Sequence, residues 1–259
     1  MIDHINVYYC LSNNVGDALS PYLANKISGK FPCWTQADDP INKVMITGSI
    51  LNHQTCQTEV WGAGIAFKND TIPKTHKILA VRGFLTAKKL KNRQKYKFGG
   101  VVGDPALLMP HYYKPNIAKT HKLGIIPHYI DAGLVCNKLN QNWMRKNNSK
   151  VIDICLAPEQ FIDELLSCET VISSSLHGII LAHAYGIPVK WVKFSNNIGG
   201  DDFKFHDHYS VTTEKNIQFL DFRESIDHTL LAKFISSKPS PTGLKIDPLK
   251  LLEVCPFKK

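Results

Sequence analysis

The chain has 259 residues, of which 44% are hydrophobic and 20% charged, as in a globular protein with one large domain or two compact ones. No run approaches the roughly 18–20 apolar residues that span a bilayer. The N-terminus lacks the basic and apolar regions of a secretory signal, so we expect a cytoplasmic protein. Seven scattered cysteines without a C-x-x-C pair predict reduced thiols rather than a metal site or disulfides.

The net charge of +9 favours acidic partners. No basic motif with interleaved aromatic residues is present, so we expect no nucleic-acid partner. Six basic residues cluster between positions 88 and 97, namely Lys88, Lys89, Lys91, Arg93, Lys95 and Lys97. Their plain interpretation is a solvated helix face. The functional alternative is peripheral contact with anionic lipid at the inner face of the membrane.

The first half of the chain alternates predicted strands and helices. The strands are expected at 5–9, 43–47, 59–61, 77–81 and 101–102, and the helices at 18–28 and 84–90. This alternation is typical of a parallel sheet with helices on its faces. Residues 111–122 are polar, interrupted by proline and without periodicity, so they are expected to form a linker.

A second alternating set follows the linker. Its strands are expected at 123–126, 151–154, 170–172 and 189–192, and its helices at 158–167, 176–185, 226–236 and 248–254. The predicted fold class is therefore α/β, with two Rossmann-like domains (1–115 and 116–259) facing each other across a cleft. Ligands of such sheets bind outside the carboxyl ends of the strands. The loops that carry unusual side chains are all expected there, at 13–17, 48–49, 62–64, 82–83, 103–105, 127–129 and 173–178.

The stretch from Glu169 to Val189 is the centre of the prediction. A β-branched strand is followed by three serines and by a helix that begins near Leu176. A helix start offers free backbone N–H groups and a positive dipole end, which favour an anion. His177 in the first turn suits proton transfer there, although a hydrogen-bonded structural histidine is the alternative. His183, later in the helix, is expected to pack on the sheet.

Four other side chains follow strand ends. Arg82 suits capture of a carboxylate or phosphate, with a salt bridge to a neighbouring loop as the alternative. Asp17 suits hydrogen bonding to a sugar hydroxyl, and equally the N-cap of the following helix. His128 is a second candidate for proton transfer. Asp104, before a proline, is expected to form a turn, with substrate contact as the alternative.

Missing motifs exclude several enzyme classes. The chain has no G-x-x-x-x-G-K-[ST] loop, no G-x-S-x-G elbow and no H-E-x-x-H pair. The segment 199–209 is dense in side chains able to bind metal, which are Asp201, Asp202, His206, Asp207 and His208. Because no second anchoring cluster accompanies them, we expect a loop that lines the cleft and closes over substrate rather than a metal site.

Taken together in chain order, these motifs resemble the polysaccharide pyruvyl transferase family, and within it the succinoglycan pyruvyltransferase type. The matching segments cover roughly residues 5–210 and are Asn14-Val-Gly-Asp17, Gly48-Ser49, Trp61-Gly-Ala-Gly64, Val81-Arg-Gly83, Gly103-Asp-Pro-Ala-Leu-Leu-Met-Pro110, Gly124-Ile-Ile-Pro-His128 and Ile172-Ser-Ser-Ser-Leu-His-Gly178. Each segment alone is weak, and their order makes the set specific.

The resemblance implies a glycosyltransferase-B-like fold with the acceptor on the N-terminal domain. It also implies transfer of pyruvate from phosphoenolpyruvate to two hydroxyls of a bacterial surface polysaccharide, forming a cyclic ketal and releasing phosphate. The expected partners are phosphoenolpyruvate and a lipid-linked oligosaccharide or polysaccharide, with no cofactor and no metal. The expected catalytic residues are His177, Asp17 and His128; the donor-binding residues are Arg82, Ser174, Ser175, Gly178, Lys190 and Lys193; and the acceptor-binding residues are Asn14, Gly16 and Asp104.

One residue departs from the family pattern. The family typically has arginine where this chain has Ser175, and Lys190 or Lys193 is expected to supply the missing charge. Two alternatives stay open. A nucleotide-sugar glycosyltransferase would need a carboxylate to hold a ribose, for which only Glu159 or Asp201 is available. A non-catalytic protein that binds sugars or anions is the other.

Overall fold

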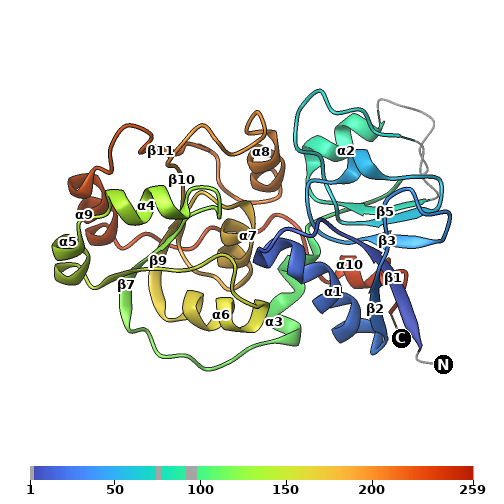
Figure 1. The fold of residues 1–259 in the computed structure, drawn as a ribbon, viewed down its shortest axis with the longest axis horizontal. Helices are drawn as coiled ribbons and strands as arrows, with labels where there is room; N and C mark the ends of the chain where they lie inside the picture. The colour runs from blue at the N-terminus through green and yellow to red at the C-terminus, as the bar shows by residue number, and fades with distance from the viewer. Residues whose placement is uncertain (1–2, 74–76, 92–97, 259) are drawn as a thin grey trace.

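A computed structural model describes residues 3–73, 77–91 and 98–258. It contains two parallel sheets with helices on their faces, which confirms the predicted α/β class (Figure 1). The first sheet has the strand order β2-β1-β3-β4-β5-β6 and the second the order β11-β10-β9-β7-β8. The glycosyltransferase-B-like arrangement and the domain boundaries at 1–115 and 116–259 stay predictions.

The first sheet is built from the N-terminal residues. Its strands are β1 His4–Tyr8, β2 Phe31–Trp34, β3 Lys43–Met45, β4 Thr58–Trp61, β5 Lys77–Val81 and β6 Phe98–Val102. Its other elements are α1 Val15–Ser28, η1 Leu51–His53, α2 Phe84–Lys91, η2 Pro105–Leu108 and α3 Met109–Tyr112. The expected linker at 111–122 is shorter than predicted, because α3 ends at Tyr112 and the next strand begins at His121.

The second sheet follows. Its strands are β7 His121–Ile126, β8 Ser149–Val151, β9 Cys168–Ser173, β10 Val189–Lys193 and β11 Leu220–Asp221. Its helices are α4 Ala132–Lys138, α5 Gln141–Lys146, α6 Pro158–Leu166, α7 Leu176–Ala184, α8 Phe203–Tyr209 and α9 His228–Ser236. The last helix, α10 Lys250–Glu253, packs on β6 of the first sheet. The central strand β9 is buried almost throughout, as expected where helices cover both faces of a parallel sheet.

The two sheets share one apolar core. A continuous cluster of buried side chains runs from Val7 of β1 and Leu19 of α1 to Val171 of β9 and Ile180 of α7. Figure 1 shows α1 and α7 between the sheets. The chain also returns to the first sheet at its end, where the indole Nε1 of Trp61 donates a hydrogen bond to the carbonyl of Leu251 at 2.8 Å. The halves are therefore packed against each other around α7.

Two predictions about local structure were wrong. Helix α1 begins at Val15 rather than Ala18, because Asn14 caps it by accepting a hydrogen bond from the backbone N–H of Asp17. Asp17 is therefore in the first turn and is not the N-cap. The segment 199–209 is not wholly a loop, since Phe203–Tyr209 forms α8.

Candidate active site

A cavity of about 210 Å³ lies between the two halves, at the carboxyl ends of both sheets. The loops after β1, β3, β7 and β9 converge on it, and they supply Asn14 and Asp17, Gly48 and Ser49, His128, and Ser175 and His177. Four of the seven loops singled out in the sequence thus line one cavity. We call it the reaction cavity.

The turn before α7 is fixed by Ser173 and Gly178. The Ser173 hydroxyl has one proton to donate and lies within hydrogen-bonding distance of two carbonyls, those of Ile126 and Ser175; it also accepts from the Ser175 N–H, all at 3.0–3.1 Å. A Cβ on Gly178 would lie 2.5 Å from that hydroxyl oxygen, so only glycine lets α7 start this close to the sheet. The expected donor contact at Gly178 can therefore only come from its backbone.

His177 is held between Asp104 and Gly16. Its Nε2 lies 3.6 Å from Oδ2 of Asp104, and both atoms are buried without a hydrogen-bond partner in the described structure. The other carboxylate oxygen of Asp104 caps η2 by accepting from Ala106 N–H at 3.0 Å, which confirms the expected turn. Asp104 is fully buried behind His177, so it contacts the imidazole rather than the cavity.

Gly16 gives His177 its room. A Cβ on Gly16 would lie 2.0 Å from the imidazole Nδ1. Any side chain at position 16 would therefore overlap the histidine. The absence of a side chain, rather than a direct contact with acceptor, explains why glycine is present here.

Asp17 faces the reaction cavity from α1. Its carboxylate accepts hydrogen bonds from the Ser12 hydroxyl and from Nδ2 of Asn14, the latter at 2.7 Å. Burial raises the pKa of Asp17, while Ser12, His177 and Asn14 oppose that rise. A carboxylate with a raised pKa accepts a proton more readily, which suits a base for a sugar hydroxyl.

His128 lines the same cavity. Burial, helped by the positive charge of Lys204, lowers the pKa of His128 to about 4. Its imidazole is therefore neutral at pH 7 and is a poor proton donor. Its backbone N–H donates to the Ser174 hydroxyl at 2.8 Å, which fixes the loop after β7.

Asp131 was not predicted, and it joins three loops of the second half. Its Oδ1 accepts a hydrogen bond from the Ser195 hydroxyl at 2.5 Å, and its Oδ2 lies 3.5 Å from the Ser174 hydroxyl. Asp131 is fully buried. Ser174 thus acts within this network, whereas the hydroxyl of Ser175 makes no capping bond and faces the reaction cavity.

Comparison with known proteins gives the family of the chain. The polysaccharide pyruvyl transferase family matches residues 60–196, just over half of the chain. The chain belongs to this family. An uncharacterized protein of Acanthamoeba polyphaga mimivirus is 30% identical over 241 residues, which are 90% of this chain and 83% of that protein. The succinoglycan biosynthesis protein ExoV of Rhizobium meliloti is 29% identical over 143 residues, which are 52% of this chain and 40% of that protein.

As a member of the polysaccharide pyruvyl transferase family, the protein is a transferase with a polysaccharide acceptor. The residues expected to bind a donor are less well assembled than the residues expected to be catalytic. Lys193 forms an ion pair with Asp202 at 2.5 Å. A smaller cavity, lined by Ser174 and Lys193 among others, lies beside the reaction cavity, and Lys190 lines neither of the two. Lys204, which no sequence pattern singled out, lines both cavities.

Arg82 of this transferase is fully buried and forms the salt bridge stated as its alternative. Its Nε and Nη2 both lie 3.1 Å from Oδ2 of Asp207, and its remaining donors bond Ser49 and the carbonyl of Ile65. The guanidinium packs directly against Gly64. Anion binding by Arg82 stays a prediction, and it would require the pair with Asp207 to open.

The other acidic and histidine side chains take separate partners. Asp201 accepts a hydrogen bond from the backbone N–H of Lys68. The Nδ1 of buried His183 lies 2.9 Å from the Nε2 of buried His208. Over the described ranges no group of three potential metal ligands comes together. Glu159 accepts a hydrogen bond from the Tyr22 hydroxyl and pairs with Lys26. Neither Glu159 nor Asp201, the two carboxylates considered for holding a ribose, lines the reaction cavity.

None of the described helices is both long and apolar enough to cross a membrane. Of the basic cluster at 88–97, Lys88 and Lys89 border a surface hollow together with Lys68 and His206. Arg93, Lys95 and Lys97 lie outside the described residues, as does the side chain of Lys91. Contact with anionic lipid stays a prediction.

Proposed function

We propose that this transferase moves the pyruvate unit of phosphoenolpyruvate onto two hydroxyls of a polysaccharide sugar, forming a cyclic ketal and releasing phosphate. The observation that carries the proposal is that His177, with buried Asp104 behind it, and Asp17 line one cavity at the start of α7. An acid, a base and an anion-binding helix start are the parts that this reaction requires.

The donor would bind at the start of α7. Phosphoenolpyruvate carries a carboxylate and a phosphate, and the backbone N–H groups of Leu176, His177 and Gly178 begin the helix without helical partners. The dipole of a nine-residue helix adds favourable potential for an anion there. The hydroxyl of Ser175 faces the same cavity and is available as a further donor.

The proton balance assigns two roles. Protonation of the methylene carbon turns it into a methyl group and makes the neighbouring carbon electrophilic, so the first hydroxyl adds there. The second hydroxyl then displaces phosphate. Of the two hydroxyl protons, one replaces the proton given to the methyl group and the other leaves on phosphate. His177, with Asp104 to stabilise its charged form, is the proton donor, and Asp17 accepts from the hydroxyls.

The acceptor has a path to Asp17. A surface cavity of about 480 Å³ shares Cys10, Ser12, Asn14 and Asp17 with the reaction cavity. This volume is in the range of pockets that hold ligands larger than one sugar ring. The proposed acceptor is a lipid-linked oligosaccharide or polysaccharide, reached from the cytoplasmic side of the membrane. The scheme uses phosphoenolpyruvate as a co-substrate and needs no resident cofactor.

A thermal-shift titration tests the donor. A ligand that binds only the native state raises the melting temperature by mass action. We expect phosphoenolpyruvate to raise it and UDP-, GDP- and CMP-sugars to leave it unchanged. Stabilisation by a nucleotide sugar instead would replace the proposal with a glycosyltransferase on the same fold.

Substitution of His177 tests the chemistry. His177→Ala should lower the rate of phosphate release by about 10²–10⁴-fold, which is the usual contribution of a positioned acid or base. His111→Ala is the matched control, because His111 is exposed on α3 and lies outside the cavity. Unchanged phosphate release in a folded His177→Ala protein would remove His177 from the mechanism.

A further inference from the structure

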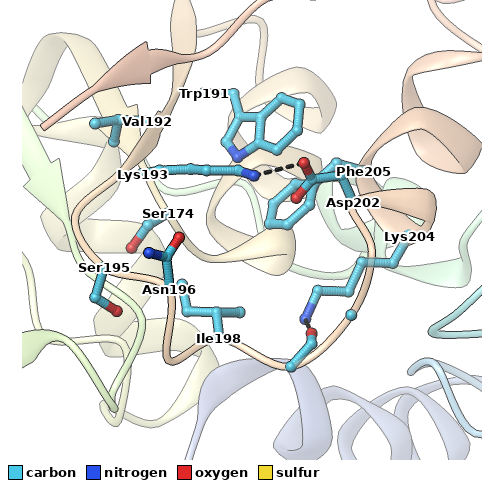
Figure 2. Close-up of a pocket in the computed structure, with 12 residues that line it drawn as sticks. Ser174, Trp191, Val192, Lys193, Ser195, Asn196, Ile198, Asp202, Lys204 and Phe205 are labelled. Atoms are coloured by element: carbon cyan, nitrogen blue, oxygen red, sulfur yellow. Dashed lines mark hydrogen bonds and ion pairs between the residues drawn. The ribbon is translucent and has the colours of Figure 1, made fainter. Parts of the chain in front are cut away.

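A second, smaller cavity lies beside the reaction cavity. It has a volume of about 80 Å³, room for a few water molecules at ~30 Å³ each but not for a sugar ring. Its polar lining comes from the turn after β9, the end of β10, the following loop and α8, and consists of Ser174, Lys193, Ser195, Asn196, Asp202 and Lys204 (Figure 2). Lys204 and the adjacent residues Ser174 and Ser175 connect the two cavities.

The charges of this small cavity leave one cation without a counterion. Figure 2 shows Lys193 bonded to Asp202, a pair with no net charge, and Lys204 apart from it. The Lys204 ammonium donates to the backbone carbonyl of Gly199 at 3.0 Å. Among the described residues no carboxylate lies within salt-bridge distance of Lys204, so the cavity has a net charge of one positive unit from two lysines and one aspartate.

A second cation, Arg82, acts on Lys204. Burial and the nearby charge of Arg82 together lower the pKa of Lys204 to about 8, while Asp202 acts in the opposite direction. Lys204 in turn lowers the pKa of His128. A half-buried ammonium that has no carboxylate partner among the described residues is stabilised by an anion that supplies the missing negative charge.

We propose that the small cavity is a subsite for a phosphate group and that Lys204 binds that phosphate. The inference rests on the proposed function, because phosphoenolpyruvate brings the phosphate and the reaction releases it. The carboxylate and the enol carbon then occupy the reaction cavity near His177, and Lys204 spans the boundary between the two groups of the donor. The hydroxyls of Ser174 and Ser195 line the same cavity and add neutral polar groups to it.

Melting temperatures in inorganic phosphate and in phosphoenolpyruvate test the subsite. The proteins are wild type, Lys204→Gln, Lys204→Arg and the control Lys122→Gln, which removes one positive charge from an exposed position at the amino end of β7. The Lys204→Gln protein should need at least about tenfold more phosphate than wild type for the same rise in melting temperature, because the substitution removes a charge-assisted hydrogen bond to the phosphate. Lys204→Arg and Lys122→Gln should behave as wild type does.

The pH dependence gives an independent readout. Between about pH 7 and pH 9.5 the wild-type response to sulfate, whose charge stays constant, should weaken as Lys204 loses its proton. In Lys204→Arg it should not weaken, because a guanidinium keeps its charge. This comparison does not depend on how stable Lys204→Gln is.

The outcomes separate the subsite from the donor. Equal phosphate responses in wild type and Lys204→Gln, or none in wild type, would overturn the subsite. A phosphoenolpyruvate response that survives Lys204→Gln would overturn the subsite and leave the proposed function standing. A phosphate response that depends on Lys204, without any response to phosphoenolpyruvate, would support the subsite and contradict the donor.

Discussion

At the scale of single residues, His177 depends on what surrounds it. Asp104 lies behind its Nε2 and Gly16 against its Nδ1, and neither contacts the cavity through a polar side chain. These two residues position the histidine rather than react themselves. Their substitutions therefore test the site without removing the reacting group.

Asp104→Asn should keep the fold, because the side-chain oxygen that caps η2 is retained. It should lower kcat by about tenfold or more and change KM for phosphoenolpyruvate little, because the neutral amide no longer stabilises a charged imidazole. Steady-state phosphate release measures both constants. A rise in KM with kcat unchanged would mean that Asp104 acts in substrate binding.

Gly16→Ala should lower both the melting temperature and the activity, because the new Cβ would overlap Nδ1 of His177. Gly133→Ala is the matched control. Each glycine is the second residue of its helix, α1 or α4, and a Cβ at Gly133 meets no atom within 4 Å. Helix propensity alone favours alanine by up to ~1 kcal/mol at either position, so opposite signs at the two sites would isolate the overlap. A stabilised, active Gly16→Ala protein would contradict the assigned packing.

At the scale of elements, α8 is held to the first half by one buried ion pair. Asp207 of α8 accepts from Arg82 and from both the N–H and the hydroxyl of Thr86 in α2. The backbone of Asp207 also packs against Gly83, where any Cβ would lie 1.9 Å from its carbonyl oxygen. Because α8 also carries Lys204, the contacts of Asp207 with the first half fix the position of the lysine proposed to bind phosphate.

Asp207→Ala should lower the free energy of unfolding by about 3–5 kcal/mol, since it leaves the Arg82 charge buried and unpaired. Chemical denaturation measures this change. Asp221→Asn, which breaks the exposed pair with Arg223, should leave the denaturation midpoint nearly unchanged. Equal effects of the two substitutions would contradict the anchoring role of the buried pair.

Strand and helix positions followed from the sequence where the apolar runs were clear, as in β5, β9 and α7. Strand β2 was not predicted, because its Pro32 has no N–H for a ladder; the strand is tolerated since it forms an edge of the sheet. Four of the loops that line the reaction cavity were predicted, because strand ends of parallel sheets converge. Lys204 was not, because it reaches the cavity through the tertiary packing of α8, which no local pattern indicates.

At the scale of the whole molecule, a buried pair of histidines lies where the two halves meet. The Nδ1 of His183 in α7 and the Nε2 of His208 in α8 share a hydrogen bond of 2.9 Å. Burial lowers the pKa of His183 to about 4 and that of His208 well below its ordinary value. The unfolded chain therefore binds more protons than the folded one as the pH falls below about 6.5.

Stability should accordingly be highest above pH 6.5 and fall between about pH 6.5 and pH 4, with His183 alone accounting for roughly 3 kcal/mol of the loss. Denaturation at several pH values measures this loss of stability. It is carried out on wild type and on the double variant His183→Phe, His208→Leu. His128 and the carboxylates titrate in both proteins, so the difference isolates the buried pair. An identical pH dependence in the two proteins would contradict the account.

The most direct measurement of the central claim follows the fate of the donor carbon. The protein is incubated in D₂O with phosphoenolpyruvate labelled with ¹³C at the methylene carbon and with a mixture of lipid-linked oligosaccharides. We predict that the label appears as a methyl group with one deuterium, on a ketal carbon bound to two sugar oxygens, with one phosphate released per ketal and none formed by His177→Ala. Labelled free pyruvate without any labelled glycan, or a glycan modified only when a nucleotide sugar is supplied, would contradict the account.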